Sequence, residues 1–269
     1  MPGTLAFTLI FNSVFAPALA GVGAGLLAHK LLCGRQLATA LAAIAGMLCI
    51  YGNQFMWPPL QAMDWLLLLL PLFALPALLF TKAASYWAMT LVVSLAAAYF
   101  ILNPALRFAA SPLLTIAAAG MVWAIYLASQ SKGHAGRGET GALAGVALAS
   151  AIIIITTGGS ALLGQLMGAL CATSVGLLLF SLISKQPMPL LSMRAAIFGV
   201  SLIATAYAEI HFAWLALPLL LAIAAPHIAR RFTASHILGE GLAFIIVLIF
   251  SAPAWGTLLV RRLGNPAAY

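Results

Sequence analysis

Residues 207–240 have the sequence YAEIHFAWLALPLLLAIAAPHIARRFTASHILGE, in which an apolar run is bounded at both ends by charged residues and histidines. The apolar run covers residues 212–228, close to the roughly 20 residues that a helix needs to cross a bilayer. The stretch also contains two of the four acidic residues and three of the five histidines of the chain. This pattern predicts a membrane-spanning helix whose polar residues lie at the two membrane surfaces.

The composition of the whole chain agrees with that prediction. Of 269 residues, 64% are hydrophobic and 6% are charged, whereas an ordinary globular domain has roughly a quarter of charged residues. So few charges cannot cover the surface of a soluble protein, so we expect lipid to surround most of the exterior. The apolar runs are continuous rather than alternating, which favours helices over a β-barrel. The predicted fold is all-α, a polytopic transmembrane helix bundle.

About ten spans are expected from the apolar runs. These runs cover residues 5–27, 37–54, 65–80, 85–102, 112–128, 142–156, 161–183, 195–208, 212–228 and 238–260. Nine spans are the alternative, if the residues around Glu209 form one long, broken helix. Pro71 and Pro76 are expected to kink the third span, because proline lacks an amide donor and clashes with the preceding turn.

The hydrophilic segment SQSKGHAGRGET, residues 129–140, falls between the fifth and sixth expected spans. We expect one integral membrane domain over residues 1–269, with two five-helix halves, 1–130 and 140–269, as a further hypothesis. An odd number of spans per half would invert the second half relative to the first, as in many secondary transporters. The two halves show no similarity residue by residue, so this hypothesis depends on the count alone.

The basic residues are distributed unevenly between the loops. Nine of the twelve lie in loops that follow odd-numbered spans. Because loops rich in lysine and arginine stay in the cytoplasm, these loops are predicted to be cytoplasmic. We therefore expect an integral protein of a bacterial-type inner (cytoplasmic) membrane. Arg261 and Arg262 do not follow the pattern, so the side of the C-terminus stays open.

Four residues are candidates for substrate binding or proton coupling. Glu240 lies in the first turn of the last expected span, where an ionisable group near hydrocarbon is costly and often functional. His236 is four residues earlier, on the same helical face, and could tune it. Glu209 and His211 lie between two spans, and in a tight turn both could point into one cavity. The structural alternatives are stabilisation of a helix end for the first pair and a simple interfacial turn for the second.

His227, Arg230 and Arg231 are candidates for binding a phosphate or a lipid headgroup. A guanidinium group pairs well with phosphate oxygens, and the residues lie at the expected inner surface of the membrane. The structural alternative is a cap at the C-terminal end of a helix, combined with anchoring by positive charge.

Common catalytic patterns are absent from the sequence. It contains no H-E-x-x-H, no G-x-S-x-G, no pair of Asp-rich motifs and no C-x-x-C. We therefore expect no catalytic residues, no metal and no cofactor, and an enzyme is disfavoured. The basic residues are scattered in ones and twos, which argues against nucleic acid as a partner.

The leading functional hypothesis is a secondary transporter or permease for a small or amphipathic solute. The first alternative is a non-catalytic membrane subunit that scaffolds a larger complex, and the second is a membrane enzyme that acts on lipid. The expected partners are the lipid bilayer and either other membrane proteins or further copies of the chain. A polar cavity near the bilayer midplane would favour a transporter, whereas a packed interior with an apolar flank would favour a scaffold.

Overall fold

The computed structural model describes residues 11–30, 35–80, 82–106, 111–128, 138–184 and 188–264. In these ranges the regular structure is entirely helical, which confirms the all-α prediction. In chain order the helices are η1 (Phe11–Phe15), α2 (Ala16–Lys30), α3 (Arg35–Tyr51), η2 (Gly52–Gln54), α4 (Ala62–Leu69), η3 (Leu70–Ala74), α5 (Leu75–Leu79), α6 (Ala83–Leu102), α7 (Pro112–Ala128), α8 (Glu139–Thr156), α9 (Ala161–Ser184), α10 (Leu191–Tyr207), α11 (Phe212–Phe232) and α12 (His236–Gly264).

Seven helical segments in the described ranges are long and apolar enough to cross a membrane. They are Arg35–Gln54, Ala62–Leu79, Ala83–Leu102, Glu139–Thr156, Ala161–Ser184, Phe212–Phe232 and His236–Val260. Three further apolar helices, Phe11–Leu27, Pro112–Ala128 and Leu191–Tyr207, are shorter. The fold is that of a polytopic helical membrane protein, but the predicted count of about ten spans is not confirmed. The beginning of the first expected span lies outside the described residues.

Two interruptions of the apolar runs coincide with changes of helix type. The third expected span is divided into α4, the 3-10 helix η3 and α5, and Pro71 lies in the first turn of η3. The first described segment, η1, is a π-helix that contains Asn12 and Ser13. Both changes follow from the sequence, because proline and short polar side chains disturb the regular backbone hydrogen bonding of an α-helix.

The chain reverses direction between α10 and α11. Residues 208–211 are not helical, and Glu209 has a φ of 54°, in the left-handed region that few residues other than glycine adopt. The region around Glu209 is therefore a turn between two separate helices, and not one long, broken helix.

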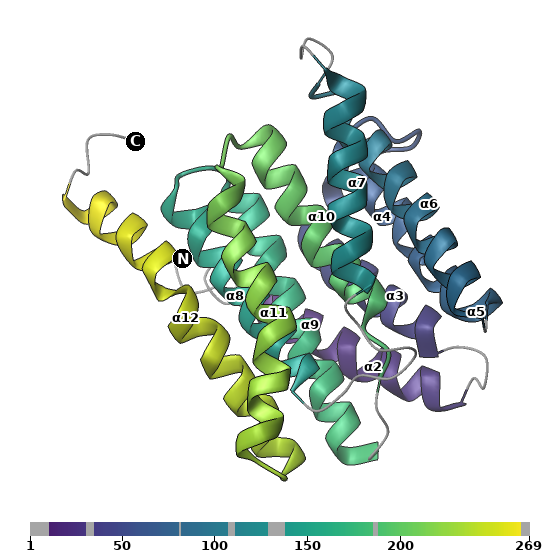
Figure 1. Cartoon of the computed structure of the whole chain (residues 1–269), viewed down its shortest axis with the longest axis vertical. Coiled ribbons are helices and arrows are strands. Elements are labelled where there is room, and N and C mark those ends of the chain that lie inside the picture. Colours follow the sequence, from purple (N-terminus) through teal and green to yellow (C-terminus); the bar gives the residue numbers. More distant parts are fainter. Residues whose placement is uncertain are drawn as a thin grey trace.

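Helices α8 and α10 form the interior of the bundle. Every residue of α10 from 191 to 204 is buried, and α10 packs against α3, α7, α9 and η3. Figure 1 shows α12 at one edge of the molecule and α5 and α6 at the opposite edge, with α10 between them. The ring of Trp123 in α7 stacks between Phe73 and Phe198, at centroid distances of 5.1 and 5.3 Å. Helices from early and late parts of the chain thus share one core, and the division into two halves stays a prediction.

Candidate functional site

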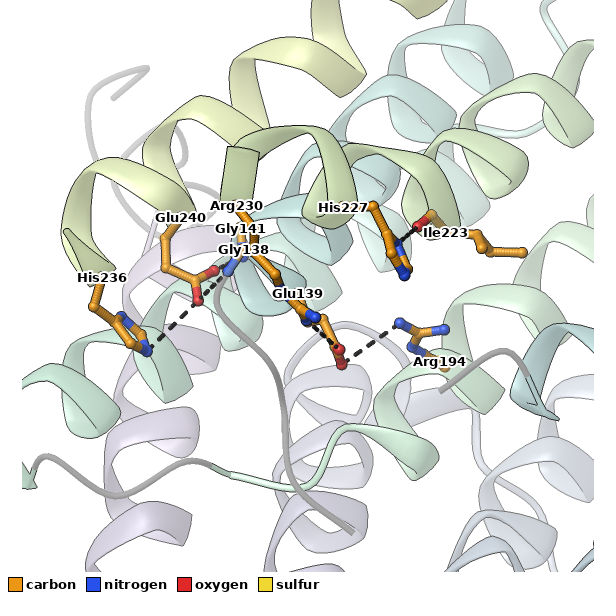
Figure 2. Close-up of polar contacts among 9 residues, drawn as sticks. All are labelled: Gly138, Glu139, Gly141, Arg194, Ile223, His227, Arg230, His236 and Glu240. Atoms are coloured by element: carbon orange, nitrogen blue, oxygen red, sulfur yellow. Dashed lines mark hydrogen bonds and ion pairs between the residues drawn. The ribbon is translucent and has the colours of Figure 1, made fainter. Parts of the chain in front are cut away.

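Four charged residues from four helices gather at one end of the bundle. Glu139 is the first residue of α8, Arg194 lies in the first turn of α10, Arg230 in the last turn of α11, and Glu240 near the beginning of α12. We call these four residues the charge cluster. Figure 2 shows the Glu139 carboxylate between Arg194 and Arg230, with Oε2 at 3.7 Å from the Arg194 guanidinium and Oε1 at 3.0 Å from that of Arg230.

The Arg194 side chain is nearly inaccessible, with 3% of its surface exposed. Its guanidinium lies over the ring of Tyr126, at 5.7 Å from the centroid. Because Arg194 is close to the N-terminal end of α10, the helix dipole disfavours its positive charge. The negative charge of Glu139 and the π face of Tyr126 therefore compensate for the desolvation of Arg194.

Glu240 caps the N-terminal end of α8 from the neighbouring helix α12. Its carboxylate accepts the backbone N–H of Gly138 at 2.8 Å and that of Gly141 at 2.6 Å, and its side chain is 2% exposed. The first amides of a helix have no partner within the helix, and the positive end of the helix dipole favours an anion there. The two charge-assisted hydrogen bonds thus tie α12 to the beginning of α8.

Two glycines make this contact sterically feasible. Gly138 has a φ of 85°, which a residue with a Cβ rarely adopts. A Cβ on Gly141 would overlap with the backbone carbonyl oxygen of Glu240. The α8 backbone can therefore approach α12 closely enough for the Glu240 carboxylate to reach its amides.

The predicted pair His236 and Glu240 does lie together. His236 Nε2 is 3.9 Å from Glu240 Oε1, and the His236 side chain is 42% exposed. Among the three predicted headgroup residues, Arg230 joins the charge cluster and still has 38% of its side chain exposed. His227 and Arg231 are exposed, and His227 Nδ1 lies 2.9 Å from the backbone oxygen of Ile223. Figure 2 shows His227 and Arg230 on the same helix.

The other predicted pair, Glu209 and His211, lies at the opposite end of α11. Both residues are exposed, and His211 Nδ1 accepts the backbone N–H of Ala213 at 3.4 Å as the N-cap of α11. A helix of 21 residues is about 30 Å long, so the structure does not bring the two predicted pairs together. Whether either pair binds a substrate or a proton stays a prediction.

The hydrophilic segment 129–140 was expected to lie wholly between the fifth and sixth spans, and this was wrong for its last two residues. Glu139 and Thr140 are helical and buried, because their helix packs against α11 and α12. The central roles of Glu139 and Arg194 were therefore missed. One signal could have found Glu139: it directly precedes an apolar run in a chain with only four acidic residues, and an ionisable group that close to hydrocarbon is often paired.

A cavity of about 510 Å³ lies at the other end of α8 and α10. We call it the end cavity, and its lining includes Tyr51, Gln61, Pro104, Ser160, Ile203 and Tyr207. Both helices run from the charge cluster to this cavity, and the 13 helical steps from Arg194 to Tyr207 in α10 correspond to roughly 20 Å. The Tyr207 hydroxyl donates to the backbone oxygen of Ile101 at 2.8 Å and so ties the end of α10 to α6.

The fourth acidic residue, Asp64, has a structural role beside the end cavity. Asp64 Oδ2 accepts the backbone N–H of Leu60 at 3.2 Å and that of Gln61 at 3.0 Å, and Oδ1 accepts the Tyr51 hydroxyl at 3.0 Å. These bonds close a capping box at the N-terminal end of α4. Asp64 thus holds Tyr51 and Gln61 in place at the wall of the cavity.

Comparison with protein-family models, curated proteins and solved structures gives no match. Within the described residues, no three His, Cys, Asp or Glu side chains gather as ligands for a metal ion. The fold and the site together define a class: a polytopic helical membrane protein with a largely buried charge cluster at one end of its central helices and a cavity at the other.

Replacing Glu240 with glutamine is expected to lower the free energy of unfolding by roughly 1–3 kcal/mol. A glutamine offers one acceptor oxygen and directs its amide group at the second backbone N–H, so one buried donor loses its partner. Thermal unfolding of the detergent-purified protein measures the effect. The matched control is Glu209→Gln, because Glu209 is exposed. Equal melting temperatures for the two variants would contradict the capping role.

Proposed function

We propose that the protein is a secondary transporter, or permease, for a small or amphipathic solute. The observation that carries the proposal is the end cavity, which lies at one end of α8 and α10 while a buried charge cluster joins the other end of the same helices. A transporter needs a site that is open to one side of the membrane and closed to the other.

The lining of the end cavity suits a solute with both polar and apolar parts. Gln61, Ser160 and Tyr207 contribute hydrogen-bonding groups, and Ile203 and Met63 contribute apolar surface. None of the residues that line this cavity in the described structure carries a charged side chain. A neutral solute could therefore enter without leaving a charge unpaired in a dry site.

The charge cluster is suited to act as the closed gate. Glu139 connects α8 to α10 and α11, and Glu240 connects α12 to α8. Two carboxylates and two guanidinium groups balance one another, so the closed state leaves no net charge in the cluster. Separating them in hydrocarbon would be costly, but water that enters during opening would solvate each charge. The gate thus opens only together with a water-filled pathway.

Glu240 is the residue that we expect to couple opening to a proton. Protonation would remove its negative charge and weaken the two charge-assisted bonds to α8, and His236 at 3.9 Å offers a neighbouring proton acceptor. For a solute found to be taken up into proteoliposomes, Glu240→Gln is expected to abolish acceleration by a pH gradient. Glu209→Gln is the control that should keep it, and a Glu240→Gln variant that still responds to the gradient would contradict the coupling.

One observation favours the scaffold as a second candidate. The middle of the bundle is filled by the stacked rings of Phe73, Trp123 and Phe198, and the end cavity is lined by the turns at the helix ends. A scaffold would keep this packing permanently, whereas a transporter must exchange it for an alternative packing during each cycle.

Cysteine accessibility separates the two candidates without knowledge of the solute. In a background lacking Cys33, Cys49 and Cys171, Ser160→Cys reports on the end cavity and Ser192→Cys on the buried beginning of α10. We expect a water-soluble thiol reagent to modify Ser160→Cys in open membrane fragments and to leave Ser192→Cys unmodified.

Adding Glu139→Gln to each reporter is then the decisive step. For a transporter, Glu139→Gln should accelerate modification of Ser192→Cys by about tenfold and slow modification of Ser160→Cys. The reason is that the population shifts from the state open at the end cavity to the state open at the charge cluster. Simple loosening of the fold would accelerate both reactions. Any result other than opposite changes at the two ends would contradict the proposal.

A further inference from the structure

A second cavity lies on the flank of the bundle, far from the charge cluster. This groove of about 470 Å³ is formed by η1, α2, α8 and α9, and its lining is apolar except for Ser13, Gln165 and Cys171. We call it the flank groove. It belongs to the exterior that faces lipid in a polytopic membrane protein, so its natural contents come from the bilayer.

The amide of Gln165 lies near one end of the flank groove. Along α9 the groove extends from Gly164 to Val175, which corresponds to about 16 Å of helix. This length matches one leaflet, half of a hydrocarbon core about 30 Å thick. Gln165 lies about one turn from the beginning of α9 at Ala161, so the amide is near one membrane surface and the apolar part extends towards the midplane.

Gln165 and Gly168 give the groove its binding features. The Gln165 side chain is half-buried, and it makes no hydrogen bond to another described residue. An amide at this depth gains by finding a partner, because hydrocarbon offers none. Among the described residues, no atom lies within 4 Å of the position that a Cβ on Gly168 would occupy, so these residues leave the floor of the groove open there.

We propose that the flank groove binds one acyl chain of a membrane glycerolipid, with the Gln165 amide donating a hydrogen bond to the ester carbonyl. The ester is the polar group that lies where a lipid chain leaves the headgroup, which is the depth of Gln165. A second copy of the protein fits less well, because two facing grooves would enclose a void. The site does not depend on the proposed transport function.

Native mass spectrometry of the detergent-purified protein tests the site with dioleoyl-phosphatidylethanolamine as the probe. We expect one retained lipid per chain. Gly168→Leu places a side chain in the groove and should lower the retained fraction roughly fivefold or more, since the site is then overpacked. Gly23→Leu is the matched control, because Gly23 on α2 also faces open space and lies outside the groove. Unchanged retention in Gly168→Leu, or an equal loss in Gly23→Leu, would overturn the proposal.

The contact with the ester carbonyl has its own test. Gln165→Leu should lower retention of the ester lipid by roughly threefold to tenfold, the range for a hydrogen bond inside a membrane. An ether-linked lipid with the same chains and headgroup has no carbonyl, so Gln165→Leu should leave its retention unchanged. Retention of the ether lipid also shows that the variant is folded. An equal effect on both lipids, or no effect on either, would overturn the assignment of Gln165.

Discussion

Glu139→Gln is expected to lower the free energy of unfolding by about 3–5 kcal/mol, the cost of breaking a buried ion pair by removing one partner. The substitution keeps the shape of the side chain and removes its charge. Arg194, with 3% of its side chain exposed at 3.7 Å from Glu139, would then hold a buried positive charge at the unfavourable end of α10. Arg230 is 38% exposed, so water can compensate in part for the carboxylate that its guanidinium loses.

Thermal unfolding in detergent measures the effect, and a double variant tests its cause. If the cost comes from the uncompensated guanidinium, adding Arg194→Met to Glu139→Gln should recover part of the lost stability, because the buried charge that lost its partner is then absent. Glu209→Gln is the control for removal of an exposed carboxylate. A double variant that is no more stable than Glu139→Gln alone would contradict this explanation.

Gly141→Ala is expected to cost about 2–4 kcal/mol, from overpacking and from the lost hydrogen bonds of Glu240 together. The added Cβ would overlap with the backbone oxygen of Glu240, so α8 and α12 would have to move apart. The bond from the Gly141 amide to the Glu240 carboxylate, now 2.6 Å, would lengthen as a result. The melting temperature of the purified protein should therefore fall.

Gly241→Ala is the matched control for this prediction. Gly241 is the neighbour of Glu240 on α12, and no atom in the described part of the chain lies within 4 Å of its Cβ position. Because alanine is a better helix former than glycine, this change should stabilise the protein by about 0.5–1 kcal/mol. Opposite shifts of the melting temperature would show that close approach of α8 and α12 decides the result. Equal shifts of the melting temperature in Gly141→Ala and Gly241→Ala would contradict this explanation.

The class of fold was accessible from the sequence, and so were several of its interruptions. Long apolar runs predict helices in a membrane because each amide there must find its partner locally. Pro71 predicted a kink in the third span, where the structure has the 3-10 helix η3, and the residues around Glu209 predicted a break. The number of spans could not be settled, because 17-residue helices such as α7 and α10 lie at the lower limit of a spanning helix.

The candidate site was accessible only in part. His236 and Glu240 are four residues apart on one helix, so their proximity follows from helical geometry. The pairing of Arg230 with Glu139 joins residues 91 positions apart, and no local pattern indicates it. The burial of Glu139 likewise depends on the packing of α8 against α11 and α12, which lie about 70 to 125 residues further along the chain.

The sequence by itself determined that this protein is an apolar, all-helical chain with its few charges near helix ends. In lipid the backbone must form its hydrogen bonds within each helix, and the long apolar runs that form such helices can be read directly from the sequence. Only the tertiary structure decided which of those charges meet. Glu139 and Glu240 occupy the same end of the bundle as Arg194 and Arg230 because α8, α10, α11 and α12 pack together. That packing depends on side-chain shape across helices far apart in the sequence, as at Gly141, where the absence of a Cβ lets Glu240 reach α8.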